Sequence, residues 1–401
     1  MTIIGSQFSP EIRRALRIDI SATLLFTVFA GLTSPFIGLI LRAELGATPL
    51  QLAVMSSAGG ACLLLSLLWA RAFHARPLPH LVWTGFVARG VFLLVPFVSS
   101  AWSFVGLVIA RDFFGAAAAP AQAAVVERVY PRAQRGRALG LVRMAGAVLG
   151  IGLALAAGQL FERVGYRWIF VAAALLGMAA SLRQRRLAVP EPVPFGGESL
   201  TGLRGAWLTV RDDHAFQRLL VASFLFGSGC WIQTPAHPLL LVDVLHVSAS
   251  QVGVFAAVAA MGTLAGSAYW GWLVDRRSSL EALRMMYLVG AATPLIYYVA
   301  WSPWVLVASS VTDSLLAVGL ELVWMMAVID AAGPQRTAQY VAIGATLAGV
   351  RGVAGPLVGG LLIHAFGVHV VYLVAAILTL SGAWLVGREL RVRIPAPALT
   401  R

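Results

Sequence analysis

Apolar runs separated by short polar joints fill almost the whole chain. A first run ends near Leu41, and most of the later runs are 17–27 residues long. The later runs lie at about 50–70, 80–99, 102–126, 138–161, 166–182, 219–241, 250–274, 285–301, 303–329, 338–364 and 367–387. A helix crosses a bilayer core of ~30 Å with about 20 apolar residues, because each residue adds ~1.5 Å. The pattern therefore predicts an all-α polytopic membrane protein with twelve transmembrane helices.

The composition agrees with a membrane protein and argues against a soluble enzyme. Hydrophobic residues make up 59% of the 401 residues and charged residues 12%, which is too apolar for a soluble chain of this length. The two cysteines, Cys62 and Cys230, both lie inside apolar runs, and no metal-ligand spacing is present. We therefore expect no disulfide, no metal and no cofactor.

The arginines predict the orientation of the chain in the membrane. All 30 basic residues are Arg: 23 lie in the termini and in the joints after even-numbered runs, three in the joints after odd-numbered runs and four inside runs. Arg close to the end of a span stays cytoplasmic. Both termini are therefore expected in the cytoplasm, and a chain rich in Ala and Gly without Lys suggests a bacterial cytoplasmic membrane.

The chain also contains an internal repeat. Its one long joint, 183–218, separates six runs from six, and the two halves match at an offset of 200–203 residues: GATPLQLAV with HVSASQVGV, and GQLFERVGYRWIFVAAALLG with GGLLIHAFGVHVVYLVAAIL. We expect a six-helix bundle at 1–182, a cytoplasmic linker at 183–218, and a second bundle with a short cytoplasmic tail at 219–401. Two bundles repeated in one orientation place a binding site between them, near the middle of the membrane.

Charged residues occur deep inside the apolar runs. Arg111 lies ~13 Å into its run, Asp112 follows it, and Asp313 lies ~15 Å into the run that corresponds to it, 202 residues later. Glu321 is two turns further along that run. A charge at this depth costs at least ~2.5–3.5 kcal/mol on insertion scales, so it needs a partner or a wet cavity and indicates function by default.

Twelve spans, a central linker and a six-plus-six repeat resemble the major facilitator superfamily of secondary transporters. GWLVDRR resembles the family's cytoplasmic gate motif, so the resemblance assigns Gly271, Asp275 and Arg276 to the gate; the first-half copy, WARAFHARP, has Phe73 near the expected acid. RDFFG resembles the Arg-x-x-x-Gly pattern of proton-linked exporters. GVAGPLVGG, at 352–360, is similar to an antiporter motif, but the family places that motif in helix five and this chain has it in helix eleven.

The resemblance implies that helices one, four, seven and ten line a cavity in which Arg111 and Asp313 face each other. Neighbouring residues point ~100° apart on a helix, so we expect Arg111 in the cavity and Asp112 against a neighbouring helix, with Arg89 as a partner. For Arg111 a coupling or substrate role and a structural ion pair both stay open.

Proton coupling falls to the two carboxylates of helix ten, since no His lies in the middle of a run. Asp313 is either a proton or cation site or part of a salt bridge, and Glu321 either lines the inner half of the same cavity or does not. Arg351 either binds an anion or bridges to one of these carboxylates.

The predicted function is alternating-access transport, most simply proton-coupled export of a small, partly hydrophobic molecule by a monomer. Uptake of an organic anion or sugar by proton symport is the alternative, with Arg89, Arg111 or Arg351 holding the anion. A membrane sensor or assembly protein that does not transport is a third. No ATP-binding loop and no cluster of catalytic side chains is present, so the chain is not expected to be an enzyme.

Overall fold

A computed structural model describes residues 9–72, 76–189, 211 and 213–393. All regular structure in this part of the chain is helical, which confirms the predicted fold class, and nine stretches are long and apolar enough to cross a membrane. The chain divides into two compact units, residues 1–196 with 247–257, and residues 197–246 with 258–401. The predicted domain boundaries stay a prediction. Residues 190–210 of the predicted linker lie outside the described residues.

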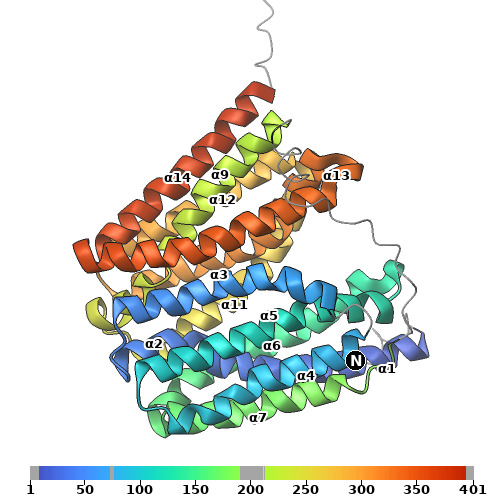
Figure 1. The fold of residues 1–401 in the computed structure, drawn as a ribbon, viewed down its shortest axis with the longest axis vertical. Coiled ribbons are helices and arrows are strands. Elements are labelled where there is room, and N and C mark those ends of the chain that lie inside the picture. Colours follow the sequence, from blue (N-terminus) through green and yellow to red (C-terminus); the bar gives the residue numbers. More distant parts are fainter. Residues whose placement is uncertain (1–8, 73–75, 190–210, 212, 394–401) are drawn as a thin grey trace, which may run out of the picture. The chain divides into compact units, whose positions relative to one another are not determined.

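Six helical segments belong to the first half, at the places where the apolar runs predict them (Figure 1). They are α1 (Pro10–Thr33) continued by η2 (Ser34–Phe36) and α2 (Ile37–Ala43), then α3 (Pro49–Ala72), α4 (Pro77–Gly90) continued by η3 (Val91–Phe97), α5 (Ala101–Val129), α6 (Arg132–Val164) and α7 (Tyr166–Gln184). Most of these helices extend beyond their apolar run, because helical hydrogen bonding continues past the hydrocarbon core.

The second half follows the same plan. Its elements are α9 (His214–Ile232) continued by α10 (Ala236–Leu239) and η4 (Leu240–Val244), then α11 (Ala249–Arg276), α12 (Ser279–Tyr298), η5 (Pro303–Val305), α13 (Leu306–Phe366) and α14 (Val368–Arg393). The expected break at WSPW is confirmed, because α12 ends at Tyr298 and Pro303 opens the short turn η5.

One predicted joint is itself helical. Helical structure runs through all 61 residues of α13, although the sequence predicts two helices separated by a joint near 330–337. A Cβ placed on Gly344 would lie 3.3 Å from Cζ2 of Trp324, whereas twenty residues of straight helix span ~30 Å. The helix therefore doubles back on itself, and its two arms, Leu306–Ala332 and Gln339–Phe366, serve as spans ten and eleven.

Each unit has its own aromatic core. In the first, Phe29, Phe92 and Phe170 form a chain of rings from α1 through η3 to α7, with centroids 6.0 and 5.1 Å apart. In the second, Phe226 of α9 stacks on Tyr287 of α12 at 3.9 Å. α14 packs along both α9 and α12 (Figure 1), and the Phe226–Tyr287 stack joins α9 directly to α12.

The internal repeat is visible in the backbone. Left-handed residues occur at Gly46 and His246, 200 residues apart, and at Gly165 and Gly367, 202 residues apart. The helices that follow the first pair begin with the same capping box: Gln51 Oε1 accepts from the Thr48 amide at 2.8 Å, and Gln251 Oε1 from the Ser248 amide at 2.9 Å. The repeat predicted from the sequence is thus confirmed in turn and cap geometry.

Candidate functional site

A cavity of about 700 Å³ opens inside the first unit. Its walls come from α1, α3, α4, α5 and α7, and they are mainly small and apolar. Three of the predicted site residues line it, namely Arg89, Arg111 and Asp112. An apolar chamber with a few converging polar groups is the usual form of a small-molecule site.

Arg111 and Asp112 form an ion pair with each other. Arg111 Nε and Nη2 donate to Asp112 Oδ1 at 2.9 and 2.5 Å, and the two side chains are 21% and 25% exposed. The expectation that only one of them faces the cavity is wrong. The long Arg side chain folds back to its neighbour, which bridges the ~100° between consecutive positions. The Arg111 guanidinium also lies 5.7 Å from the centroid of the Phe92 ring.

Arg89 does not pair with Asp112, contrary to the expectation. Its guanidinium donates to the Ser181 hydroxyl of α7 and lies over the Phe26 ring, 4.9 Å from the centroid. Gly85 and Gly177 make room for it, because a Cβ on either residue would come within about 3.0 Å of Arg89 atoms. Arg89 therefore ties α4 to α7 and gives the cavity wall a positive charge that Ser181 does not neutralise.

In the second unit, Asp313 of α13 lies in a cluster of polar aromatic side chains. The Tyr297 hydroxyl of α12 donates to Asp313 Oδ2 at 2.7 Å. The Tyr297 ring lies 5.2 Å from the ring of His237 and 5.2 Å from that of Tyr372. Below, this group of four (His237, Tyr297, Asp313 and Tyr372) is called the Asp313 cluster.

Two members of the Asp313 cluster have unused hydrogen-bonding capacity. Within the described part of the chain, His237 Nδ1 and the Tyr372 hydroxyl are buried without a hydrogen-bond partner. Each buried polar atom without a hydrogen-bond partner destabilises the folded protein by about 1–3 kcal/mol. Two such atoms close to a carboxylate could form hydrogen bonds with a polar ligand, and the carboxylate can bind a proton. His237 was not among the predicted site residues. It lies between Pro235 and Pro238 near the end of an apolar run, and this pair of prolines was the available signal.

Glu321 lies two turns along α13 from Asp313 and is exposed. An exposed carboxylate in the middle of a membrane helix belongs beside water rather than lipid tails. The Arg111 and Asp313 side chains belong to different units, so their expected encounter stays a prediction.

Arg351 is bound to backbone rather than to a carboxylate. Its Nη1 donates to the Ser223 carbonyl oxygen at 2.5 Å and to Ser223 Oγ at 3.2 Å, while Nε is buried without a partner among the described residues. The guanidinium fills the notch left by Gly227 of α9, since a Cβ there would collide with it. In this structure Arg351 links the second arm of α13 to α9, and the expected bridge to Asp313 or Glu321 is not made.

The predicted gate motif lies at the C-terminal end of α11. Asp275 and Arg276 are exposed, and the Arg276 guanidinium lies 5.1 Å from the centroid of the Trp272 ring on the same helix. A Cβ on Gly271 would meet nothing within 4 Å, so no described residue requires glycine there. Phe73, in the first-half copy, lies outside the described residues. The role of Gly271, Asp275 and Arg276 in gating therefore stays a prediction.

The motif at 352–360 fits closely against the end of α9. A Cβ on Gly355 would lie 2.8 Å from Cβ of Trp231, and one on Gly359 would collide with the Ile232 carbonyl oxygen. Glycine at these two positions therefore lets the second arm of α13 approach the end of α9 closely.

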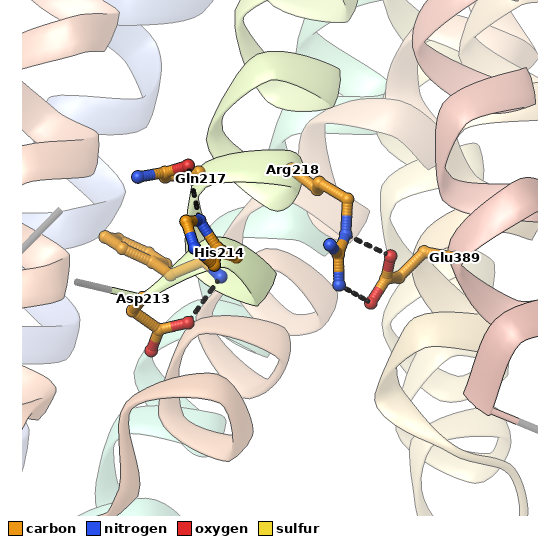
Figure 2. A network of polar contacts seen from close by, with 6 residues as sticks. Asp213, His214, Gln217, Arg218 and Glu389 are labelled. Carbon is orange, nitrogen blue, oxygen red and sulfur yellow. Dashed lines mark hydrogen bonds and ion pairs between the residues drawn. The ribbon is translucent and has the colours of Figure 1, made fainter. Parts of the chain in front are cut away.

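An ion pair joins the start of α9 to the end of α14. Figure 2 shows Arg218 and Glu389 facing each other, with Arg218 Nε donating to Oε2 at 2.6 Å and Nη2 to Oε1 at 3.1 Å. On the other side of α9, Asp213 caps the helix by accepting from the Phe216 amide at 2.9 Å and also accepts from the Tyr340 hydroxyl at 2.5 Å. These contacts hold together the start of α9 and the end of α14. The Asp313 cluster lies elsewhere in the unit, at the C-terminal end of α12, and makes none of them.

Comparison with known proteins identifies the fold. The chain resembles the crystal structure of the nucleoside transporter NupG, with a TM-score of 0.72 and 13% identity over 94% of this chain and 99% of that one. It also resembles a bacterial homolog of the human lysosomal transporter Spinster in an inward-facing, unoccupied conformation, with a TM-score of 0.70 and 15% identity over 98% and 100%. A search of curated proteins finds no match.

The sequence profile of the Major Facilitator Superfamily matches residues 20–232 and 219–400, which together are nearly the whole chain. With twelve helical segments in the described part of the chain, nine of them long and apolar enough to cross a membrane, and with a repeated backbone, the chain belongs to the major facilitator superfamily, a family of multi-pass membrane proteins that act as secondary transporters and not as enzymes.

Proposed function

We propose that this transporter exports a small, partly hydrophobic molecule in exchange for protons. The observation that carries the proposal is the cavity of about 700 Å³ in the first unit, whose walls combine apolar side chains and the Phe26 and Phe29 rings with the Arg111–Asp112 pair. Such a lining binds an apolar body and orients one polar group. A cavity of this size suits a drug-like or metabolite-sized substrate.

The Asp313 cluster supplies the proton-binding step. An ionised Asp313 accepts the hydrogen bond from Tyr297, whereas a protonated Asp313 has a hydrogen of its own to donate. Protonation therefore changes how α13 is held to α12. A ligand or proton shifts a conformational equilibrium only through such a difference between states, and in this fold the shift corresponds to rocking of the two halves about the midplane site.

Uptake of an organic anion or sugar together with protons is the second candidate. Among the described residues that line the cavity are two arginines and one aspartate, so this part of the lining carries a net positive charge. The name of NupG as a nucleoside transporter adds nucleosides to the ligands worth testing, since they carry a sugar. Under this candidate Arg89, which has no carboxylate partner among the described residues, would bind the anion.

The test measures pH inside sealed proteoliposomes while panels of lipophilic cations, sugars, nucleosides and organic anions are added outside. The unmodified protein is compared with Asp313→Asn and with Asp330→Asn, a matched carboxylate change at an exposed position of the same helix. We expect substrate-driven proton movement in the unmodified protein and in Asp330→Asn, and none in Asp313→Asn.

The sign of the pH change separates the two candidates. Proton movement opposite to the substrate supports antiport, and movement with the substrate supports symport. Substrate flux that moves no protons would contradict coupling through Asp313. Absence of flux for every substrate class would favour a sensor or assembly role on the same fold.

A further inference from the structure

A basic groove lies at the end of the first unit where α1 begins and α7 ends, next to Ala22 and Gln184 at the edge of the cavity. Five arginines line it, three from the first two turns of α1 and two from the end of α7, together with Pro10 and Ile18. Its volume is about 470 Å³. The arginines are Arg13, Arg14, Arg17, Arg183 and Arg186.

The charges of the groove are not balanced by its own lining. No carboxylate is among the described residues that line it. The nearby Asp19 is buried, and it accepts a hydrogen bond from the Tyr130 hydroxyl at 2.5 Å. Arg17 lies four residues from Arg13 and three from Arg14, and like charges at these spacings destabilise a helix. An anion in the groove would offset this repulsion.

Four of the five arginine side chains are exposed and can receive a phosphate. The fifth, Arg183, is half-buried and donates from Nε to Ser21 Oγ at 2.9 Å. Guanidinium groups bind phosphate oxygens through two parallel N–H donors, which makes Arg the side chain best suited to this anion.

The position of the groove indicates where the phosphate comes from. It opens where the first span begins, with the buried Ile18 at its base and apolar helix directly beyond. Lipid headgroups lie at this level of a membrane, and basic pockets between transmembrane helices bind anionic headgroups. The positive-inside pattern predicts that this end of α1 faces the cytoplasm.

We propose that this groove is a binding site for the phosphate headgroup of an anionic phospholipid, which stabilises the packing of α1 against α7. The site is independent of the substrate and of the coupling ion.

The test uses delipidated protein in detergent and measures lipid binding by native mass spectrometry together with thermal unfolding. The probes are phosphatidylglycerol, cardiolipin, phosphatidylcholine and inorganic phosphate. The groove variant carries Arg13→Gln, Arg17→Gln and Arg186→Gln. The control variant, Arg137→Gln, Arg185→Gln and Arg211→Gln, loses the same charge at exposed arginines that do not line the groove.

We expect both anionic lipids to bind and to raise the melting temperature of the unmodified and control proteins. The groove variant should bind them at least about tenfold more weakly, given the contribution of each Arg near an anionic headgroup. Equal weakening in both variants would overturn the proposal in favour of general surface charge. Equal binding of phosphatidylcholine, or equal stabilisation by inorganic phosphate, would overturn it by showing that an anionic lipid is not required.

Discussion

The Arg111–Asp112 pair shows how neighbouring charges can both be accommodated in a membrane cavity. Asp112→Asn leaves Arg111 without its partner, and a double variant that combines Asp112→Asn with Arg111→Gln removes both charges. Because a hydrogen bond between charged groups contributes about 1.5–3 kcal/mol and this pair is partly exposed, we expect the single variant to be destabilised by about 1–2 kcal/mol and the double variant by less. Thermal unfolding in detergent measures both.

Transport by the same double variant separates the two readings of Arg111. If Arg111 contacts substrate or takes part in coupling, the double variant regains stability but not transport. A double variant that regains both would show that the pair is only structural, and Arg111 would lose its place in the proposed mechanism.

Tyr297 tests the Asp313 cluster without touching its carboxylate. Tyr297→Phe removes the donor at 2.7 Å from Asp313, and the ring packing against His237 and Tyr372 stays. We expect proton-coupled turnover to fall several-fold, with substrate affinity unchanged, because the hydrogen bond distinguishes the two protonation states. Tyr298→Phe is the matched control, since Tyr298 is the next residue and is exposed. A similar loss of turnover in both variants would point to general damage to α12.

At the scale of single elements, the positions and lengths of the apolar runs predict most of the helices. The run at 166–182 corresponds to α7, Tyr166–Gln184, and the run at 138–161 to α6, Arg132–Val164. The joint within α13 was predicted at 330–337, where Gly333 and Pro334 signal a break, and the chain does reverse there. What the sequence did not predict is that the backbone stays helical through the reversal. Local propensity does not determine how the reversal is made.

Gly227 shows what a small residue does for helix packing. A Cβ at this position collides with the Arg351 guanidinium, so Gly227→Ala should displace Arg351 from Ser223 and destabilise the protein by about 1–3 kcal/mol through overpacking. Gly152→Ala, in α6, meets open space and should be neutral or stabilising by up to about 1 kcal/mol, because alanine favours helix. Melting temperatures in detergent compare the two. Equal melting temperatures would mean that Arg351 adjusts freely and does not hold α9.

At the scale of the whole molecule, the repeat and the number of spans follow from the sequence, but the pairing of side chains does not. The offset of 200–203 residues predicted two equivalent halves, and the left-handed residues Gly46 and His246 reproduce it. The partners chosen by Arg89, Arg111 and Arg351 depend on rotamers and on glycine notches in neighbouring helices. No spacing along the chain encodes these contacts, so the sequence singles out charged residues inside the apolar runs but predicts neither their partners nor the place of His237 near Asp313.

The orientation of the whole chain can be tested on one helix. Arg137 and Arg163 are both exposed and lie near opposite ends of α6, ~39 Å apart by helix rise. The distribution of arginines predicts that Arg137 faces the cytoplasm and Arg163 the outside. In a background with Cys62→Ser and Cys230→Ser, single Arg137→Cys and Arg163→Cys variants are treated with a membrane-impermeant maleimide in right-side-out and inside-out vesicles. We expect labelling of Arg163→Cys only in right-side-out vesicles and of Arg137→Cys only in inside-out ones.

The opposite result would reverse the topology and move the basic groove of α1 and α7 to the outer leaflet. Labelling of both variants from the same side would show that α6 does not cross the membrane.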